Sequence, residues 1–314
     1  MSGFNWLHFS DLHLAPGGKF NTLYARTQLF NFLRKETSAN RLPCDYIFIT
    51  GDIAHKGNYD GVLSNIQQLF VSLNWNDYSR VFWAVGNHDI SRDNKIRRLL
   101  IEDIRSKDEF NNMCFEDHMS DPEIRDYLVK KASNDYHHIH RIMLNREAYN
   151  PDDLLSPHMK YSLPDLNLVV LNTCITSCDS NDEHNLYIQE CGLHYVFEGL
   201  DNSKPTIVLG HHGYQFFKNS EQTVLSHLFD SRNVDLYLCG HVHRLGYSEF
   251  PDASRDIHQI SCGGNIEGNN TRVSFLHGTY DSENHNICVK VFSYSENGNR
   301  EWQEDRNLNR RLNG

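Results

Sequence analysis

The chain has 314 residues, with 30 Lys and Arg against 41 Asp and Glu, and its formal net charge is −11. Hydrophobic residues make up 39% and charged residues 23%, a globular composition that excludes a wholly disordered chain, a collagen and a coiled coil. No stretch approaches the roughly 18–20 apolar residues of a membrane span, and the N-terminus lacks the basic and apolar regions of a secretory signal. We therefore expect a cytoplasmic protein without membrane contact, whose acidity argues against general nucleic-acid binding.

Short apolar runs typical of buried β-strands recur along the chain. Two helix-like stretches, about residues 22–36 and 59–73, separate the first three runs, and this alternation predicts a layered α/β architecture. The later runs follow one another without a clear helical pattern, so we expect mainly antiparallel strands there. The predicted strands are Trp6–Phe9, Tyr46–Thr50, Val81–Val85, Leu166–Leu171, Thr206–Leu209, Val234–Cys239, His258–Cys262, Val273–His277 and Ile287–Tyr294.

The segment 91–156 differs from the rest because it is polar, compatible with helix and free of strand-like runs. We expect it to form a helical insertion or cap on a main domain of residues 1–295. The remaining residues, 296–314, are polar and rich in Asn, and we expect them to fray or to continue into a partner or a further domain. The eight cysteines include no CxxC pair, and we interpret them as reduced core residues.

Two groups of residues in the insertion suggest a function at first sight. A short basic run would guide an anionic substrate, but acidic residues follow it at once, which favours a solvated helix face. Three histidines within residues 136–140 have no carboxylate at ligand spacing, and we interpret them as surface residues. The basic run consists of Arg92, Lys95, Arg97 and Arg98.

Five short polar motifs each follow a strand-like apolar run directly. In open α/β sheets, ligand sites lie beyond the carboxyl ends of the strands. Five strands that end in such residues therefore gather them at one edge of the sheet. The motifs are Asp11-Leu12-His13, Gly51-Asp52, Gly86-Asn87-His88-Asp89, Gly210-His211-His212 and Gly240-His241-Val242-His243.

The residue types in these motifs are metal ligands. Asp11 and His13 lie two positions apart, so on an extended chain they point the same way and can chelate one ion, and His241 and His243 share this spacing. Carboxylates, imidazoles and one amide without a thiolate suit Mn²⁺, Fe or Zn²⁺ rather than a Cys-rich structural zinc site. Seven ligands are too many for one ion, which favours two ions about 3.5–4 Å apart that share a carboxylate. The seven candidates are Asp11, His13, Asp52, Asn87, His211, His241 and His243.

The ordered series DxH, GD, GNHD, GHH and GHxH resembles the five-block signature of calcineurin-like metallophosphoesterases. The resemblance covers about residues 6–263 apart from 91–156. It implies a two-sheet β-sandwich flanked by helices, with a dinuclear centre at one edge. It also implies Mn as the favoured metal, with Fe, Zn or Ni as alternatives.

The same resemblance implies how the ligands are divided. Asp52 would bridge the two ions. His88 would lie beside the phosphate, as proton donor to the leaving oxygen or as stabiliser of charge, and Asp89 would orient His88. The first ion would be held by Asp11, His13, Asp52 and His243, and the second by Asp52, Asn87, His211 and His241.

Three further residues are candidate substrate contacts. His55 stands where the related purple acid phosphatases carry a metal-binding Tyr, three positions after the bridging Asp. Arg92 lies three positions after the GNHD motif, where its charge would meet a phosphate oxygen. His212 follows a ligand directly. A loop histidine, a solvated arginine and a residue merely near the site are the respective alternatives.

The variants of the motifs narrow the expected activity. GDIAHKG and GNHD differ from the GDxVDRG and GNHE blocks of protein Ser/Thr phosphatases, and the GDLFD block of double-strand-break repair nucleases is absent. The sequence is most similar to small bacterial cyclic-nucleotide phosphodiesterases and to metallophosphoesterase domains of bacterial defence proteins. We therefore expect hydrolysis of cyclic nucleotides or similar small phosphodiesters by a metal-activated hydroxide. A nuclease, a homo-oligomer and a regulated effector module of a larger assembly remain open.

Overall fold

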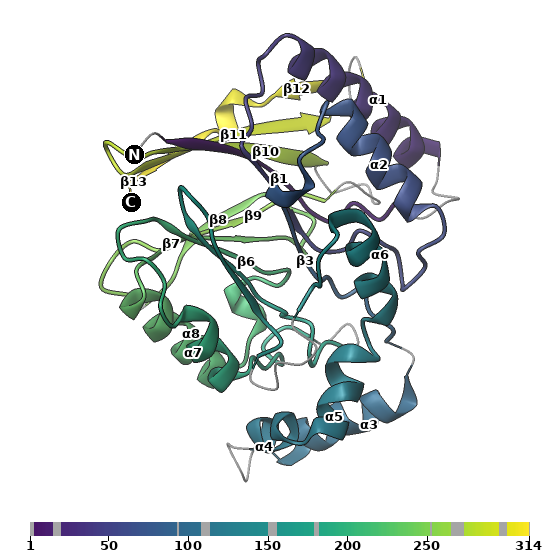
Figure 1. Ribbon diagram of the computed structural model, residues 1–314, viewed down its shortest axis with the longest axis vertical. Helices are drawn as coiled ribbons and strands as arrows, with labels where there is room; N and C mark the ends of the chain where they lie inside the picture. The colour runs from purple at the N-terminus through teal and green to yellow at the C-terminus, as the bar shows by residue number, and fades with distance from the viewer. Residues whose placement is uncertain are drawn as a thin grey trace.

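Two β-sheets face each other across a shared apolar layer, and helices cover the outer face of each sheet (Figure 1). The layer between the sheets combines side chains from both, such as Phe48 of the first and Leu238 of the second. This arrangement confirms the predicted two-sheet sandwich flanked by helices. The computed structural model describes residues 3–14, 20–92, 94–107, 114–149, 156–178, 182–251, 253–264, 273–294 and 300–313.

The first sheet has the strand order β12-β11-β10-β1-β2-β3, and β13 also pairs with β11. Strands β1, β2 and β3 are parallel, whereas the strands from β10 onward are antiparallel to their neighbours. Helices α1 (Phe20–Ser38) and α2 (Val62–Ser72) cover its outer face. The strands are β1 (Phe4–Phe9), β2 (Tyr46–Thr50), β3 (Val81–Ala84), β10 (Ser274–Asp281), β11 (Asn286–Tyr294), β12 (Trp302–Glu304) and β13 (Arg310–Asn313).

The second sheet has the order β4-β5-β6-β7-β9-β8, in which β5, β6, β7 and β9 are parallel. The prediction of mainly antiparallel strands among the later apolar runs is therefore wrong for β5, β6, β7 and β9, whereas it is confirmed for β10 and β11. Helix α7 (Glu190–Phe197) joins β5 to β6 and α8 (Asn219–Ser231) joins β6 to β7, as parallel neighbours require. The strands are β4 (Met159–Ser162), β5 (Asn167–Val170), β6 (Thr206–Leu209), β7 (Val234–Cys239), β8 (Gly246–Glu249) and β9 (His258–Ser261).

The central strands are apolar on both faces because both faces are covered. In β2, Tyr46 and Phe48 point into the layer between the sheets, while Ile47 and Ile49 pack under α1 and α2. Burial of both faces therefore explains why the sequence shows continuous apolar runs rather than alternation. The short helical turns outside the insertion are η1 (Tyr78–Arg80), η3 (Tyr214–Phe216) and η4 (Arg306–Leu308).

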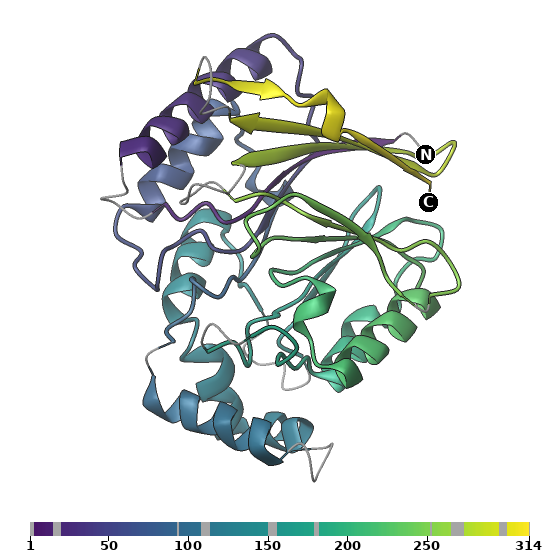
Figure 2. The same ribbon diagram turned by 180° about the vertical axis from the view of Figure 1, so that it is seen from behind.

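The described helices of the segment 91–156 lie between Lys95 and Leu144, in agreement with its predicted helical character, but they belong to two different surroundings. Helix α6 packs against the first sheet, where Tyr136 donates a hydrogen bond to Trp83 O at 3.1 Å. The other helices form a lobe at the end of the molecule, seen from both sides in Figures 1 and 2, with a small apolar core to which Ile175 and Tyr187 of the main domain also contribute. The helices are α3 (Lys95–Lys107), α4 (Cys114–Ser120), α5 (Pro122–Arg125), the π-helix η2 (Asp126–Lys130) and α6 (Asn134–Leu144).

The burial of several side chains differs from our expectation: two that we expected at the surface are buried, and two cysteines that we expected in the core are exposed. His140 is buried with its ring edge-on to Trp83, so the interpretation of surface histidines is wrong for this residue. Arg97 is completely buried, although we expected a solvated helix face there. Of the described cysteines, all of which are free, Cys191 and Cys288 are exposed and are not core residues.

The C-terminal residues 300–313 do not fray. Strands β12 and β13 pair with β11, and Trp302 is buried with its Nε1 donating to Ala25 O at 3.0 Å. Strands β12 and β13 are held mainly by backbone pairing with β11 and have few apolar residues. Their composition therefore did not predict strands. No helix in the described part of the chain is long and apolar enough to cross a membrane.

We predict that Trp302→Ala will destabilise the fold, because it leaves a cavity beside α1 and removes the bond to Ala25. Large-to-small changes of this kind cost about 3–5 kcal/mol, measured as the free energy of unfolding in urea. The neighbouring exposed Gln303→Ala is the control and should change stability by less than about 0.5 kcal/mol. Equal stability of the two variants would show that the C-terminal strands contribute little to the core.

Candidate metal centre

The seven predicted ligands come together where five parallel strands end, at one edge of the paired sheets. The loops after β1, β2 and β3 come from the first sheet, and those after β6 and β7 from the second. Backbone hydrogen bonds join neighbouring loops, from Asp11 N to Gly51 O at 3.0 Å and from Gly240 N to His211 O at 2.9 Å. The strand ends therefore bring both halves of the sequence to one place.

The first group of ligands lies around Asp11. Asp11 Oδ1 is 3.1 Å from His243 Nε2, and His13 Nε2 is 3.5 Å from the same nitrogen. Asp52 Oδ2 is 3.8 Å from His13 Nε2. One ligand atom from each of these four residues lies within 4.8 Å of the others, which is a spacing that one cation can occupy.

The second group lies on the other side of Asp52. His211 Nε2 is 3.0 Å from Asn87 Oδ1, 3.4 Å from Asp52 Oδ2 and 3.3 Å from His241 Nδ1. The same carboxylate oxygen of Asp52 therefore faces an imidazole of each group. This is the position that a carboxylate shared by two cations must have.

In each of the two buried carboxylates, one oxygen accepts hydrogen bonds and the other accepts none from the described residues. Asp11 Oδ2 accepts hydrogen bonds from Ser10 Oγ at 2.6 Å and His241 N at 3.0 Å, and Asp52 Oδ1 accepts one from His88 N at 2.7 Å. Asp11 Oδ1 and Asp52 Oδ2 are buried and accept no hydrogen bond from any described residue. Because a buried anionic oxygen without a hydrogen bond is costly, these two oxygens, which face imidazole nitrogens of His243 and His211, fit cations.

The imidazoles are also arranged as metal ligands. His211 Nδ1 donates to Thr50 O at 2.8 Å, and His13 Nδ1 donates to Ala54 O at 3.1 Å. Each bond places a proton on Nδ1, so Nε2, which faces the carboxylates, is the nitrogen that a cation would take, as in known metal-binding histidines. The donor set therefore fits two cations, with Asp52 between them.

The backbone of the ligands differs from our expectation. Asp11, His13, Asp52, His241 and His243 all have left-handed backbone, with φ between 41° and 69°. Asp11 and His13 thus meet because the chain turns sharply after β1, and not because it is extended. His241 and His243 do not chelate one ion, since their ligand atoms fall in different groups. Such conformations cost on the order of 1 kcal/mol each.

Gly86 is required by close packing of two ligand loops. A Cβ at this position would lie 2.1 Å from Asp52 N and 2.2 Å from Asp52 Oδ1. Any side chain at Gly86 would therefore displace the shared carboxylate, which explains the glycine that precedes Asn87.

The charges of the centre are coupled. Burial favours the neutral acid, but the neighbouring His211 outweighs it and holds the pKa of Asp52 well below 3.8. Burial likewise opposes the charged form of His211, yet Asp52 raises the pKa of this imidazole to about 9. A cation at His211 Nε2 replaces that proton, so binding of metal releases protons.

His88 lies on the accessible side of the centre, with its ring 4.9 Å from that of His13 and 5.1 Å from that of His55. Burial is the main reason that its pKa falls to about 4, so the ring is neutral at pH 7. The backbone N–H of Lys56 donates to Nδ1 at 3.3 Å. The proton of His88 is therefore held on Nε2, which remains available as a donor.

The described hydrogen bonds of the Asp89 carboxyl go to backbone groups and not to the ring of His88, which the resemblance implied it would orient. Asp89 Oδ1 accepts a bond from Ala54 N at 2.9 Å and its Oδ2 accepts one from Gly86 N at 2.8 Å. Burial, followed by the charge of Asp52, raises the pKa of Asp89 to about 7. The carboxyl of Asp89 thus ties together the loops after β2 and β3, whereas the orientation of His88 depends on Lys56.

The three candidate substrate contacts lie at different depths. His55 is half-buried and stacks on His88 with an angle of 15° between the rings, and Arg92 is half-buried and close enough for its charge to lower the pKa of His88. His212 is completely buried, with Nδ1 3.1 Å from Thr173 Oγ1, and one of its ring nitrogens lies within 4.8 Å of those of His211 and His241. Of the three candidates, only His55 and Arg92 are partly open to solvent.

Sequence reasoning missed Thr173, which supports the second group. Its Oγ1 accepts hydrogen bonds from His211 N at 3.2 Å and His212 N at 3.1 Å. Thr173 comes soon after β5, so the rule that functional residues follow strands applied to it. A threonine is not a metal ligand, however, and its role as a backbone support left no pattern in the sequence.

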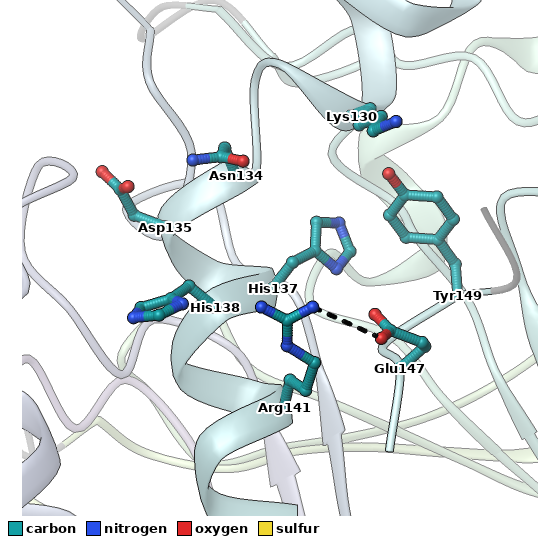
Figure 3. Close-up of a pocket in the computed structure, with 8 residues that line it drawn as sticks. All are labelled: Lys130, Asn134, Asp135, His137, His138, Arg141, Glu147 and Tyr149. Carbon is teal, nitrogen blue, oxygen red and sulfur yellow. Dashed lines mark ion pairs between the residues drawn. The ribbon is translucent and has the colours of Figure 1, made fainter. Parts of the chain in front are cut away.

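A separate hollow of about 480 Å³ lies on the insertion, beside α6 (Figure 3). His137 is in edge-on contact with Tyr149, at 4.1 Å between ring centroids, and Arg141 pairs with Glu147 at 3.9 Å. The charges of its lining residues balance, so the hollow has no marked preference for an anion. The lining residues are Lys130, Asn134, Asp135, His137, His138, Arg141, Glu147 and Tyr149.

Residues 4–245 match the sequence model of the calcineurin-like phosphoesterases. The chain belongs to the calcineurin-like phosphoesterase family. The family resemblance drawn from the five motifs is therefore confirmed, and phosphoester hydrolysis is the general activity of this family.

Two known proteins show how far the similarity of this chain extends. It is 29% identical over 245 residues to the uncharacterized metallophosphoesterase-like protein YydB of Bacillus subtilis (strain 168), which is 76% of this chain and 48% of that protein. The chain thus spans about half the length of this curated relative. The structure of a purple acid phosphatase from yellow lupin (Lupinus luteus) seeds matches with a TM-score of 0.58 at 13% identity, over 99% of this chain and 54% of that one. This second match concerns the fold alone.

We predict that Asp52→Asn will separate folding from metal pairing. The amide oxygen can still accept the bond from His88 N, whereas the NH₂ group replaces the oxygen that faces both groups. With both proteins metal-free, the variant should therefore unfold at nearly the wild-type temperature, but it should fail to retain two Mn²⁺ per chain after dialysis, measured by plasma emission spectroscopy. Asp60→Asn changes an exposed carboxylate and should retain both ions. Retention of two ions by Asp52→Asn would refute the shared role.

Proposed function

We propose that this phosphoesterase hydrolyses small phosphodiesters, with cyclic nucleotides as the favoured substrates. The observation that supports the proposal most is the unpaired buried oxygen of Asp52 between two groups of metal ligands. Two cations held there would lower the pKa of a bound water and neutralise charge on the phosphate during in-line displacement. The carboxylates, Asn87 and the four ligand imidazoles supply the positions for these cations.

The residues around the cations have separate tasks in this proposal. His88 donates a hydrogen bond from Nε2 to a phosphate or leaving-group oxygen, because Lys56 N holds the other ring nitrogen as an acceptor. Asp89 keeps Ala54 and Gly86 in place, and so fixes the spacing between Asp52 and Asn87. Arg92 attracts the anionic substrate to the side of the centre on which His88 is accessible.

The charges near His88 favour a diester over a monoester. A diester carries one negative charge at neutral pH, whereas a monoester carries about 1.5–2. The described rings in contact with His88 are the imidazoles of His13 and His55, and the nearby cation is Arg92. One guanidinium beside two imidazole rings matches a singly charged phosphate.

A small substrate is favoured over a nucleic acid for a related reason. The net charge of −11 repels a long polyanion. The basic run on α3 would have offset this effect, but Arg97 is buried and only Lys95 and Arg98 of the helical part are exposed. Hydrolysis of nucleic acid is therefore the weaker alternative.

The substrate class is tested by comparing a bis-aryl phosphodiester with the matching monoester. The protein is stripped of metal and reloaded with Mn²⁺, and kcat/KM is measured for both substrates. We expect a higher kcat/KM for the diester, followed by turnover of cyclic nucleotides that exceeds turnover of oligonucleotides. A preference for the monoester would contradict the proposed substrate class while leaving the metal centre intact.

We predict that His88→Ala will retain two Mn²⁺ per chain but lose activity about 10²–10³-fold, as is typical when a hydrogen-bond donor to developing negative charge is removed. The loss should be larger for a substrate with a poor leaving group, because the lost donor serves the leaving oxygen. His194→Ala removes an exposed histidine from α7 and serves as the control. A loss below tenfold on the poor substrate would exclude this role for His88.

A further inference from the structure

Arg97 on α3 of the insertion is a completely buried charged side chain. Its Nη2 donates to Cys174 O and Ile175 O, both at 2.9 Å, whereas Nε and Nη1 have no hydrogen-bond partner among the described residues. Burial lowers the pKa of the guanidinium to about 10, so it remains charged at pH 7. Burial of a charged group lowers the stability of the fold even when the group is hydrogen-bonded. We therefore asked what the guanidinium of Arg97 does beside the carbonyl groups of Cys174 and Ile175.

The backbone that Arg97 holds supports both loops of the second ligand group. Thr173, directly before Cys174, accepts hydrogen bonds from His211 N and His212 N. The thiol of Cys174 lies 3.4 Å from Val85 O, and Val85 is two residues before Asn87. Residues 173 and 174 therefore contact the loop that carries His211 and the loop that carries Asn87.

The first ligand group is supported by other residues. Asp11 Oδ2 is bound by Ser10 Oγ and by His241 N, and His13 Nδ1 is bound to Ala54 O. These contacts come from the loops after β1, β2 and β7, and not from the loop that Arg97 holds. Loosening residues 173–175 would therefore affect the second group much more than the first.

We propose that Arg97 is a positioning residue for the second cation, and that it acts by holding the carbonyl groups of Cys174 and Ile175 beneath the loops of Asn87 and His211. The inference rests on the two-cation arrangement of the proposed function. With this role for Arg97, helix α3 is a structural part of the metal centre, and the insertion contributes to metal binding.

The test compares variants by calorimetric titration of Mn²⁺ into metal-free protein, which resolves the two binding steps. Arg97→Met removes the charge and the donors while retaining an extended side chain, and Arg98→Met makes the same change at an exposed position of the same helix. We expect Arg97→Met to weaken the second ion about 10–100-fold, as loss of a residue that orients metal ligands does, and to leave the first within threefold. Arg98→Met should match the wild type. Arg97→Lys keeps a donor for the two carbonyl groups and should recover part of the lost affinity.

Equal weakening of both ions, or no change in either, would overturn the role of Arg97. Should Arg97→Met fail to fold, Thr173→Val removes the acceptor for His211 N and His212 N without burying a different charge, and it should show the same selective loss. Unchanged affinity for the second ion in Thr173→Val would also overturn the inference. Wild-type protein that binds a single ion would instead refute the two-cation arrangement itself, so the two failures are distinct.

Discussion

The carboxylate of Asp52 is the interaction on which the centre depends. One oxygen is fixed by the backbone of His88, and the other faces His13 on one side and His211 on the other. His13 follows a strand of the first sheet and His211 follows a strand of the second. A single side chain thus joins the two sheets at their common edge, and its position is determined by how closely the sheets pack.

The apolar layer between the sheets sets that closeness. Aromatic side chains of the first sheet, among them Phe48 and Phe82, pack with aliphatic side chains of the second. Near the centre the loops approach more closely than side chains allow, and Gly86 leaves room for Asp52. The large side chains of the apolar layer fix how the two sheets pack against each other. The absence of a side chain at Gly86 allows the ligand loops at the edge to approach.

The sequence predicts those parts of the molecule that depend on local pattern. Strand β2 was predicted because both of its faces are buried, and the ligands were predicted because each follows such a strand. Helix α7 was not predicted, because eight residues are too few to show a helical period, and Trp302 is the single buried residue of the polar strand β12. The bond partners of Asp89 and the burial of Arg97 depend on which backbone groups of distant segments lie nearby, and that information is not contained in the spacing of residue types.

The left-handed backbone of five ligands shows that the residues of the family signature are constrained by backbone conformation as well as by metal coordination. Aspartate and histidine are among the few residue types that enter this region readily, and they are also the ligands that the metals prefer. The residue types of the motif therefore meet two requirements, which are coordination of the metal and the conformation of the chain at the end of a strand. A glutamate offers the same carboxylate but lacks the same tolerance of positive φ, so an exchange that conserves charge need not conserve the turn. Clusters of aspartate and histidine with positive φ at strand ends are thus a structural mark by which such centres can be found in chains whose sequence motifs have diverged.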